Sequence, residues 1–275
     1  MAVLDRDARQ AHQLRPSGRL TTHHRATLIH DIASRLLVPA LAVRFGTPPV
    51  GTWRRDAAAL AATLADGTLD EGVAALAALN PDGVMFRPIC RDIILPAAVA
   101  LRRRYDPDAF DQSERLSKVW QLRMCLLSLD DADADPPGMD PHTAQTALTL
   151  SSTHDDLPSV EHGVALRFFD RAGWQVRDCN SHAAEEARDS AHDQRFDVAW
   201  ISLEPGQAED EIRATAQGLR RASRNTAILV LAGGPPGLLP TDPGVLDLDG
   251  YTGSATEAAE VSASVLRLRR AGLRP

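Results

Sequence analysis

The spacing of hydrophobic residues divides the chain into a helical first part and an alternating second part. The stripe of Leu28, Ile29, Ile32 and Leu36 recurs every three or four positions and predicts a first helix from about residue 22 to residue 40. Further helices are predicted, separated by Asp-Gly, Asn-Pro-Asp-Gly and Asp-Pro turns. They cover residues 57–64, 70–79, 86–105 and 110–127. Helices joined by such short turns predict a bundle.

From residue 147 onward, short apolar runs alternate with helical patterns. The predicted strands are residues 147–151, 174–177, 197–202, 228–231 and a short one near 245–251. The predicted helices are residues 160–172, 182–192, 208–222 and 256–270. Strands that alternate with helices indicate a parallel sheet. The predicted fold class is therefore α + α/β, a helical bundle followed by a flavodoxin-like (Rossmann-like) doubly wound parallel sheet of about five strands.

The end of the helix before residue 228 and the strand after it agree with this fold. Arg220 and Arg221 place positive charge at a helix C-terminus, and Asn225 is predicted to be a left-handed cap. The following run of four apolar residues is typical of a strand covered on both faces. Gly233 and Gly234 then stand at the carboxyl end of the strand, where backbone without side chains lets a ligand approach closely.

Composition shifts predict the domain boundaries. Residues 1–20 are polar and basic and are predicted to be a flexible arm, followed by the bundle over residues 21–129. Residues 130–145 are acidic and proline-rich without apolar periodicity, which predicts an interdomain linker. The α/β domain follows over residues 146–272.

Charge and cysteine content exclude several classes of protein. A net charge of -7 argues against direct nucleic-acid binding, and we interpret the arginines at residues 102–104 as a solvated helix face. Cys90, Cys125 and Cys179 are far apart and odd in number, which excludes a disulfide framework and a cysteine zinc site. No run is apolar enough for a membrane span or a signal peptide. We expect a soluble, cytoplasmic protein.

Five segments share their order and spacing with a known family. They are residues 93–101 and 105–110 in the bundle, and residues 168–176, 221–225 and 233–234 in the α/β domain. Together they resemble the cobalamin-binding modules of bacterial light and redox regulators, in particular the photosynthesis antirepressors of the PpaA, AerR and AppA type. The resemblance covers roughly residues 56–270. It implies a tetrapyrrole between the two domains and a partner transcription regulator.

The chain also departs from this family. The family's Asp-x-His-x-x-Gly motif supplies the lower cobalt ligand and a glycine that admits the corrin tail. Here Asp156 is kept, but Pro158 replaces the histidine and Glu161 replaces the glycine. Proline has no ligating atom, and a glutamate side chain is expected to crowd the site. Tyr105 stands in place of the family's tryptophan over the corrin, and the Gly-Ala-Asp of the last strand is Asp-Leu-Asp at residues 247–249.

Two other histidines can replace the missing ligand. His154 lies in the same loop and His162 follows Glu161, and a neutral imidazole ligates cobalt or heme iron. We take His154 as the candidate metal ligand. For catalysis, Ser202 stands at a strand end, but it lacks a nucleophile elbow and the sequence names no base partner. We expect no catalytic residue and no enzyme activity.

These observations predict a non-enzymatic sensor that binds cobalamin, or alternatively heme, and acts on a transcription regulator. A second hypothesis is a degenerate interaction module with no cofactor, and a third is a corrinoid methyl carrier. No direct nucleic-acid binding and no membrane partner are expected. The predicted pocket is lined by residues at the strand ends: Ser151, Ser152, Thr153, His154, Asp156, Ser202, Leu203, Gly233, Gly234, Tyr251 and Thr252.

Overall fold

The fold is described from a computed structural model of the chain. It describes residues 53–79, 86–104, 112–129, 145–151, 159–179, 183–234 and 243–272, all within one compact unit of residues 46–275. The predicted arm, the first predicted helix and nearly all of the predicted linker lie outside these residues. None of the described helices is both long and apolar enough to cross a membrane.

The helical part follows the predicted order. Its elements are α4 (Trp53–Asp66), α5 (Leu69–Leu79), α6 (Phe86–Ile89), a π-helical turn (Cys90–Ile94), α7 (Leu95–Arg104) and α8 (Gln112–Ser128). The predicted helix at residues 86–105 is thus one continuous helical run with a wider turn inside it. Gly72 lets α5 pack closely, because a methyl group there would lie 2.8 Å from Cys125 Sγ on α8 and from Leu64 on α4.

The α/β part is a five-stranded parallel sheet, which confirms the predicted fold class. Its strand order is β2-β1-β3-β4-β5, so the winding reverses between β1 and β3, the place where open α/β sheets form a crevice. The strands are β1 (Thr146–Ser151), β2 (Gln175–Cys179), β3 (Val198–Ser202), β4 (Leu229–Gly233) and β5 (Gly250–Thr252). The helices are α9 (Val160–Arg171), α10 (Ala183–Asp193), α11 (Glu209–Ala222) and α12 (Ala258–Arg270).

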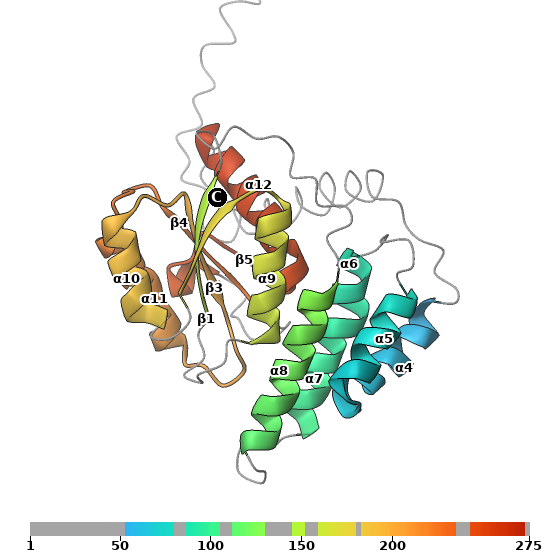
Figure 1. Cartoon of the computed structure of the whole chain (residues 1–275). Coiled ribbons are helices and arrows are strands. Elements are labelled where there is room, and N and C mark those ends of the chain that lie inside the picture. The colour runs from blue at the N-terminus through green and yellow to red at the C-terminus, as the bar shows by residue number, and fades with distance from the viewer. Residues whose placement is uncertain are drawn as a thin grey trace, which may run out of the picture. The chain divides into compact units, whose positions relative to one another are not determined.

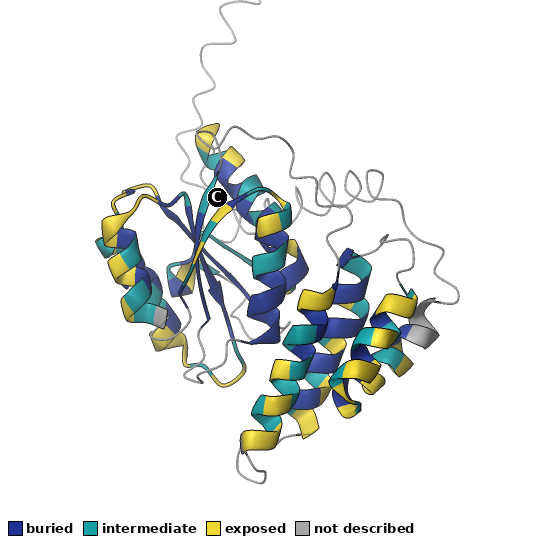
Figure 2. Ribbon diagram, in the orientation of Figure 1, coloured by how far each residue is buried: buried dark blue, intermediate teal, exposed yellow. Residues whose placement is uncertain are grey.

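Two helical layers cover the sheet. Figure 1 shows α10 and α11 on one face and α9 and α12 on the other. Every residue of β3 and β4 is buried, as Figure 2 shows by colour, because side chains that alternate along a doubly covered strand enter a core on either face. Leu148, Ile201 and Val230 face the α10–α11 layer, whereas Trp200 and Leu231 face α9 and α12.

The core on the α9–α12 face continues into the helical part. Leu122 and Leu126 of α8 belong to the same buried cluster as Val164 and Phe168 of α9. The rings of Phe86 and Phe168 lie 5.2 Å apart, centroid to centroid. The helical part and the α9–α12 layer therefore share one hydrophobic core.

Two local predictions are wrong. Asn225 is not a left-handed cap: α11 ends at Ala222, and the buried Asn225 amide donates to Phe196 O at 2.7 Å while its oxygen accepts from Ala227 N–H at 3.1 Å. The strand predicted near residues 245–251 is a 3₁₀ turn (Pro243–Leu246) followed by the short β5. Asp247 between them has φ of 60°, a left-handed conformation that glycine adopts at less cost. Asp247 stands where the motif that this chain resembles has a glycine, so the replacement puts a residue with a side chain in a left-handed conformation.

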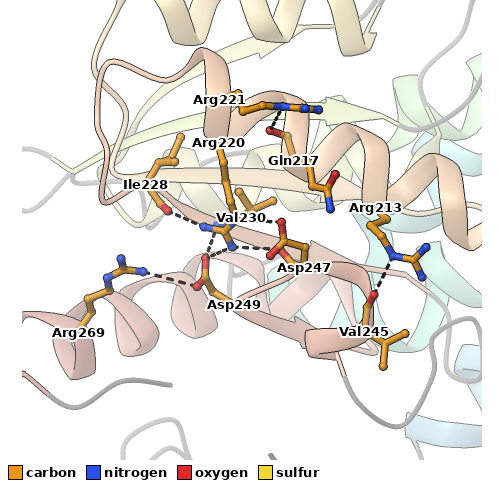
Figure 3. Close-up of polar contacts among 10 residues, drawn as sticks. All are labelled: Arg213, Gln217, Arg220, Arg221, Ile228, Val230, Val245, Asp247, Asp249 and Arg269. Carbon is orange, nitrogen blue, oxygen red and sulfur yellow. Dashed lines mark hydrogen bonds and ion pairs between the residues drawn. The ribbon is translucent and has the colours of Figure 1, made fainter.

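Arg220 of α11 contacts the chain at the amino ends of β4 and β5 (Figure 3). Its guanidinium donates to Ile228 O at 3.2 Å, to Asp247 O at 3.0 Å and to Asp249 Oδ2 at 2.6 Å. Asp249 also accepts from Val230 N–H at 2.8 Å. Arg220 thus joins α11 to both strands through specific acceptors, at the edge of the sheet opposite the predicted pocket.

Candidate functional site

The carboxyl ends of four strands place predicted pocket residues in one row. Ser151 is in register with Ser202, Ser202 with Gly233, and Gly233 with Thr252. Leu203, Gly234 and Tyr251 adjoin this row in the sequence, and the Tyr251 hydroxyl donates to Gly234 O at 3.2 Å. The other predicted lining residues, Ser152, Thr153, His154 and Asp156, lie outside the described residues.

The space at Gly233 is filled by a protein side chain. A Cβ on Gly233 would lie 2.3 Å from Cζ2 and 2.6 Å from Cη2 of the fully buried Trp200 ring. Trp200 in turn packs edge-on against Phe169 of α9, with ring centroids 5.9 Å apart. The prediction that Gly233 lets a ligand approach the backbone is therefore not supported, because this glycine makes room for an indole.

A buried polar network lies behind the row. His162 of α9 is completely buried, with Nε2 2.7 Å from Asp178 Oδ1 and Nδ1 3.0 Å from Ser202 Oγ. Trp200 Nε1–H donates to Ser202 Oγ at 3.1 Å, and Thr149 donates to Asp178 at 3.1 Å. A neutral His162 that donates from Nε2 and accepts at Nδ1 satisfies each of these contacts. The network ties α9 to β1, β2 and β3.

This network decides two predictions. His162 is not available to ligate cobalt or iron, because both ring nitrogens have protein partners and the ring is enclosed, so its prediction as an alternative ligand is wrong. Ser202 does have an imidazole partner, which sequence reasoning missed because 40 positions separate the two residues. The pattern Ser202–His162–Asp178 resembles a hydrolase triad, but the N–H of Leu203 donates to Gly233 O at 2.7 Å and does not face a substrate oxyanion.

A charged cluster joins the helical part to the carboxyl edge of the sheet. Arg102 of α7 forms an ion pair with Glu161 in the first turn of α9, and its Nη1 lies 3.2 Å from Oε2 of Glu204, two residues after β3. Burial, and secondly the neighbouring Glu161 carboxylate, raise the pKa of Glu204 to about 7, against the lowering effects of Ser159 and Arg102. The prediction of a fully solvated arginine face is wrong for Arg102, although Arg103 and Arg104 are exposed.

Glu161 therefore has a different role from the one expected. Its carboxylate forms an ion pair with Arg102 of α7. The local fold explains its position, because Ser159 caps α9 by accepting from His162 N–H at 3.0 Å. This cap fixes the first turn so that Glu161 faces Arg102 while His162 faces the sheet.

A groove of about 580 Å³ lies between α7 and the loop after β5. One wall is a stripe of α7 and the preceding π turn, and the other is the segment that follows Thr252. The floor is mainly apolar, with arginines toward both ends of the α7 stripe. The lining residues are Arg91, Leu95, Pro96, Val99, Ala100, Arg103, Gly253, Ser254 and Glu257. None of the predicted pocket residues lines this groove, and the nearest of them in the sequence is Thr252, which precedes Gly253.

The lining of the groove is mainly apolar and carries a few charged side chains. Leu95, Val99 and Ala100 offer an apolar surface, and Arg103 has no hydrogen bond or ion pair within the described part of the chain. That part contains no cluster of three metal-ligating side chains, and its histidines are the enclosed His162 and His192 on α10. His154, the predicted metal ligand, lies outside the described residues.

Comparison with known proteins shows the fold. Neither the protein-family models nor the curated proteins gave a match to the sequence. Among solved structures, the monomethylamine corrinoid protein of Methanosarcina barkeri aligns with a TM-score of 0.61 at 12% identity, over 77% of this chain and 99% of that chain. A cobalamin-binding protein from Desulfitobacterium hafniense DCB-2 aligns with a TM-score of 0.37 at 15% identity, over 75% and 96%. The methanol:cobalamin methyltransferase complex MtaBC of Methanosarcina barkeri gives 0.39 at 14%, over 88% and 92%. The chain thus shares the fold of a corrinoid protein, a helical bundle followed by a Rossmann-like α/β domain.

Proposed function

We propose that this protein is a non-enzymatic regulator that binds a tetrapyrrole, cobalamin or heme, in the groove between α7 and the loop after β5. The observation that carries the proposal is the position of the groove. It lies beside the loop after β5, at the carboxyl edge of the sheet, and both parts of the chain line it. The fold shared with a corrinoid protein supports this ligand class.

A groove with walls from two parts of the chain suits a sensor. A ligand shifts a conformational equilibrium only by its different affinity for the two states. A tetrapyrrole that contacts Val99 on one wall and Ser254 on the other favours the arrangement in which both walls are close. We propose that the partner protein is a transcription regulator, which recognises this arrangement of the two walls.

The chemistry of the groove agrees with a binding role. The apolar stripe of α7 would lie against the flat face of the macrocycle, and Arg91, Arg103 and Ser254 would meet polar groups at its rim. Bound cobalt or iron would supply visible absorption, and His154 is the residue proposed to hold it. The buried Ser202 hydroxyl and its enclosed His162 partner favour a structural role, which supports the absence of catalysis.

A second candidate function is a cofactor-free interaction module. The observation in its favour is Trp200, whose ring fills the space beside Gly233 at the row of strand ends. A carrier of corrinoid methyl groups is the third candidate, and only the shared fold favours it.

An absorbance titration with hydroxocobalamin, adenosylcobalamin and hemin, in the dark and after illumination, tests these functions. We expect a saturable spectral shift at one equivalent that His154→Ala weakens. Ala100→Trp should abolish the shift by filling the groove, because Ala100 is exposed there and a large side chain does not disturb the core. Ala62→Trp, at an exposed alanine of α4, is the matched control and should bind as the unchanged protein does. No shift with any of the three ligands would leave the interaction module.

A further inference from the structure

Arg102, Glu161 and Glu204 form a largely buried cluster in which one basic side chain faces two acidic ones. One guanidinium lies between two carboxylates, with exposed side-chain fractions of 29% for Arg102, 9% for Glu161 and 14% for Glu204. Oε1 of Glu204 is buried without a hydrogen-bond partner. Two ionised carboxylates beside one arginine leave a net charge of about -1 out of water, which is costly, whereas one proton on Glu204 makes the cluster neutral.

We propose that Arg102, Glu161 and Glu204 form a proton-linked latch that holds the C-terminal turns of α7 against the carboxyl edge of the sheet and loosens as pH rises. The proposal concerns regulation of the groove and rests on the proposed function only in its link to the ligand. Arg102 is near the end of α7, next to the buried Leu101, so local opening of these turns separates Arg102 from both carboxylates.

The direction of the effect follows from the proton affinity of Glu204. In the closed latch its pKa is raised to about 7, chiefly by burial, whereas in water a glutamate has a pKa of about 4.3. The closed state therefore binds the proton more tightly and is favoured at low pH. As pH rises from about 4.3 to 7, the equilibrium constant for opening of the latch increases. Above this range the constant no longer changes with pH.

The neighbouring groups leave Glu204 as the titrating residue. Among the described residues, the charged groups that act on it are Glu161 from α9 and Arg102 from α7, and Ser159 supplies a hydrogen bond. His162, the residue after Glu161, has its ring directed to Ser202 and Asp178 and not to this cluster. Arg102 stays protonated throughout, as guanidinium does in proteins.

The latch and the groove are on the same helix. Val99, Ala100 and Arg103 line the groove, and Arg102 lies among them in the sequence. Opening of the α7 end therefore displaces Arg103 and loosens this wall of the groove. A tetrapyrrole that needs both walls binds more weakly as pH rises through the same window, and by reciprocity it raises the pH at which the latch opens.

Amide hydrogen exchange of the full chain tests the latch without ligand. After correction for intrinsic exchange, we expect the protection of amides in residues 101–104 to fall about 30-fold between pH 5.5 and 8.5, most of it below pH 7.5, for one proton with these two pKa values. Glu204→Gln, a neutral isostere, should keep these amides protected at every pH. The matched control Glu260→Gln alters another half-buried carboxylate that pairs with Arg87, and should keep the wild-type slope at α7.

Ligand titration at pH 6 and pH 8 separates the two proposals. Weaker binding at pH 8 that Glu204→Gln removes would support the link to the groove. Equal affinities at both pH values would overturn that link. The latch would be overturned if the protection of amides in residues 101–104 did not change with pH, or if it still changed with pH in Glu204→Gln. Either result would overturn it even if a tetrapyrrole binds. A pH-dependent α7 in a protein that binds no tetrapyrrole would keep the latch and remove the proposed function.

Discussion

The contact between Gly233 and Trp200 gives the glycine pair at the end of β4 a packing role. A glycine pair at a strand end is typical of a ligand site, and the sequence supports that interpretation. The structure instead places the Trp200 ring where a Cβ would stand. A bulky residue on the neighbouring strand is visible in the sequence, but its direction toward Gly233 depends on strand register, which the sequence does not give.

Substitution of Gly233 is therefore expected to destabilise the fold. Gly233→Ala should lower the free energy of unfolding by about 2 kcal/mol, because the new methyl group overlaps a fully buried ring and the core has no room for it. Urea denaturation of the full chain measures this change.

A double-mutant cycle identifies the cause. Trp200→Phe removes the overlapping ring atoms, so Gly233→Ala should cost about 1 kcal/mol less in that background. Gly163→Ala on α9 is the matched control: its new Cβ would meet Leu126 at an ordinary 3.4 Å, and alanine favours helix. Equal costs of Gly233→Ala with and without Trp200 would contradict this account.

Asp247 carries a backbone cost that glycine removes. Its φ of 60° favours Gly, then Asn or Asp, over other residues. Asp247→Ala should therefore be about 1 kcal/mol less stable than Asp247→Gly. Both variants lose the same long contact to Arg220 Nε at 3.7 Å, so their difference reports the backbone alone. Thermal unfolding of the two variants measures the difference, and equal midpoints would show that this residue does not need a left-handed conformation.

At the scale of elements, the first turn of α9 organises the candidate site. Ser159 caps the helix, Glu161 faces α7 and His162 faces the sheet. The sequence predicted this helix at residues 160–172, close to the observed Val160–Arg171, because its apolar pattern is local. It did not predict the partners, because Arg102, Asp178 and Ser202 are distant along the chain and meet only through the tertiary fold.

The His162 network is expected to support the fold and not to bind metal. His162→Ala should lower the free energy of unfolding by about 3 kcal/mol, since it leaves a cavity and removes one hydrogen bond each from the partners Asp178 and Ser202. In contrast, the spectrum of a bound tetrapyrrole should be unchanged in the folded fraction. If His162→Ala changed the spectrum of the bound tetrapyrrole and His154→Ala did not, His162 and not His154 would be the metal ligand.

At the scale of the whole molecule, the order of elements could be predicted and the shared core could not. Periodicity indicated each strand and helix of the sheet to within a few residues, since apolar patterns are local. We interpreted the acidic segment at residues 130–145 as a linker and therefore predicted two separate domains. Yet Leu126 and Phe86 of the helical part share a core with Phe168 of α9, a contact that no local pattern encodes.

This shared core predicts that the α/β part does not fold well alone. A fragment of residues 145–275 would expose the apolar face of α9, including Phe168, that α6 and α8 cover in the full chain. We expect this fragment to bind a hydrophobic dye and to unfold without a sharp transition, whereas the full chain unfolds cooperatively. A monomeric fragment with cooperative unfolding would show that the contact between the two parts is dispensable. The shared core also restricts the proposed switch: separation of the two parts uncovers apolar surface, so the cheaper movement is the local opening of the α7 end at Arg102.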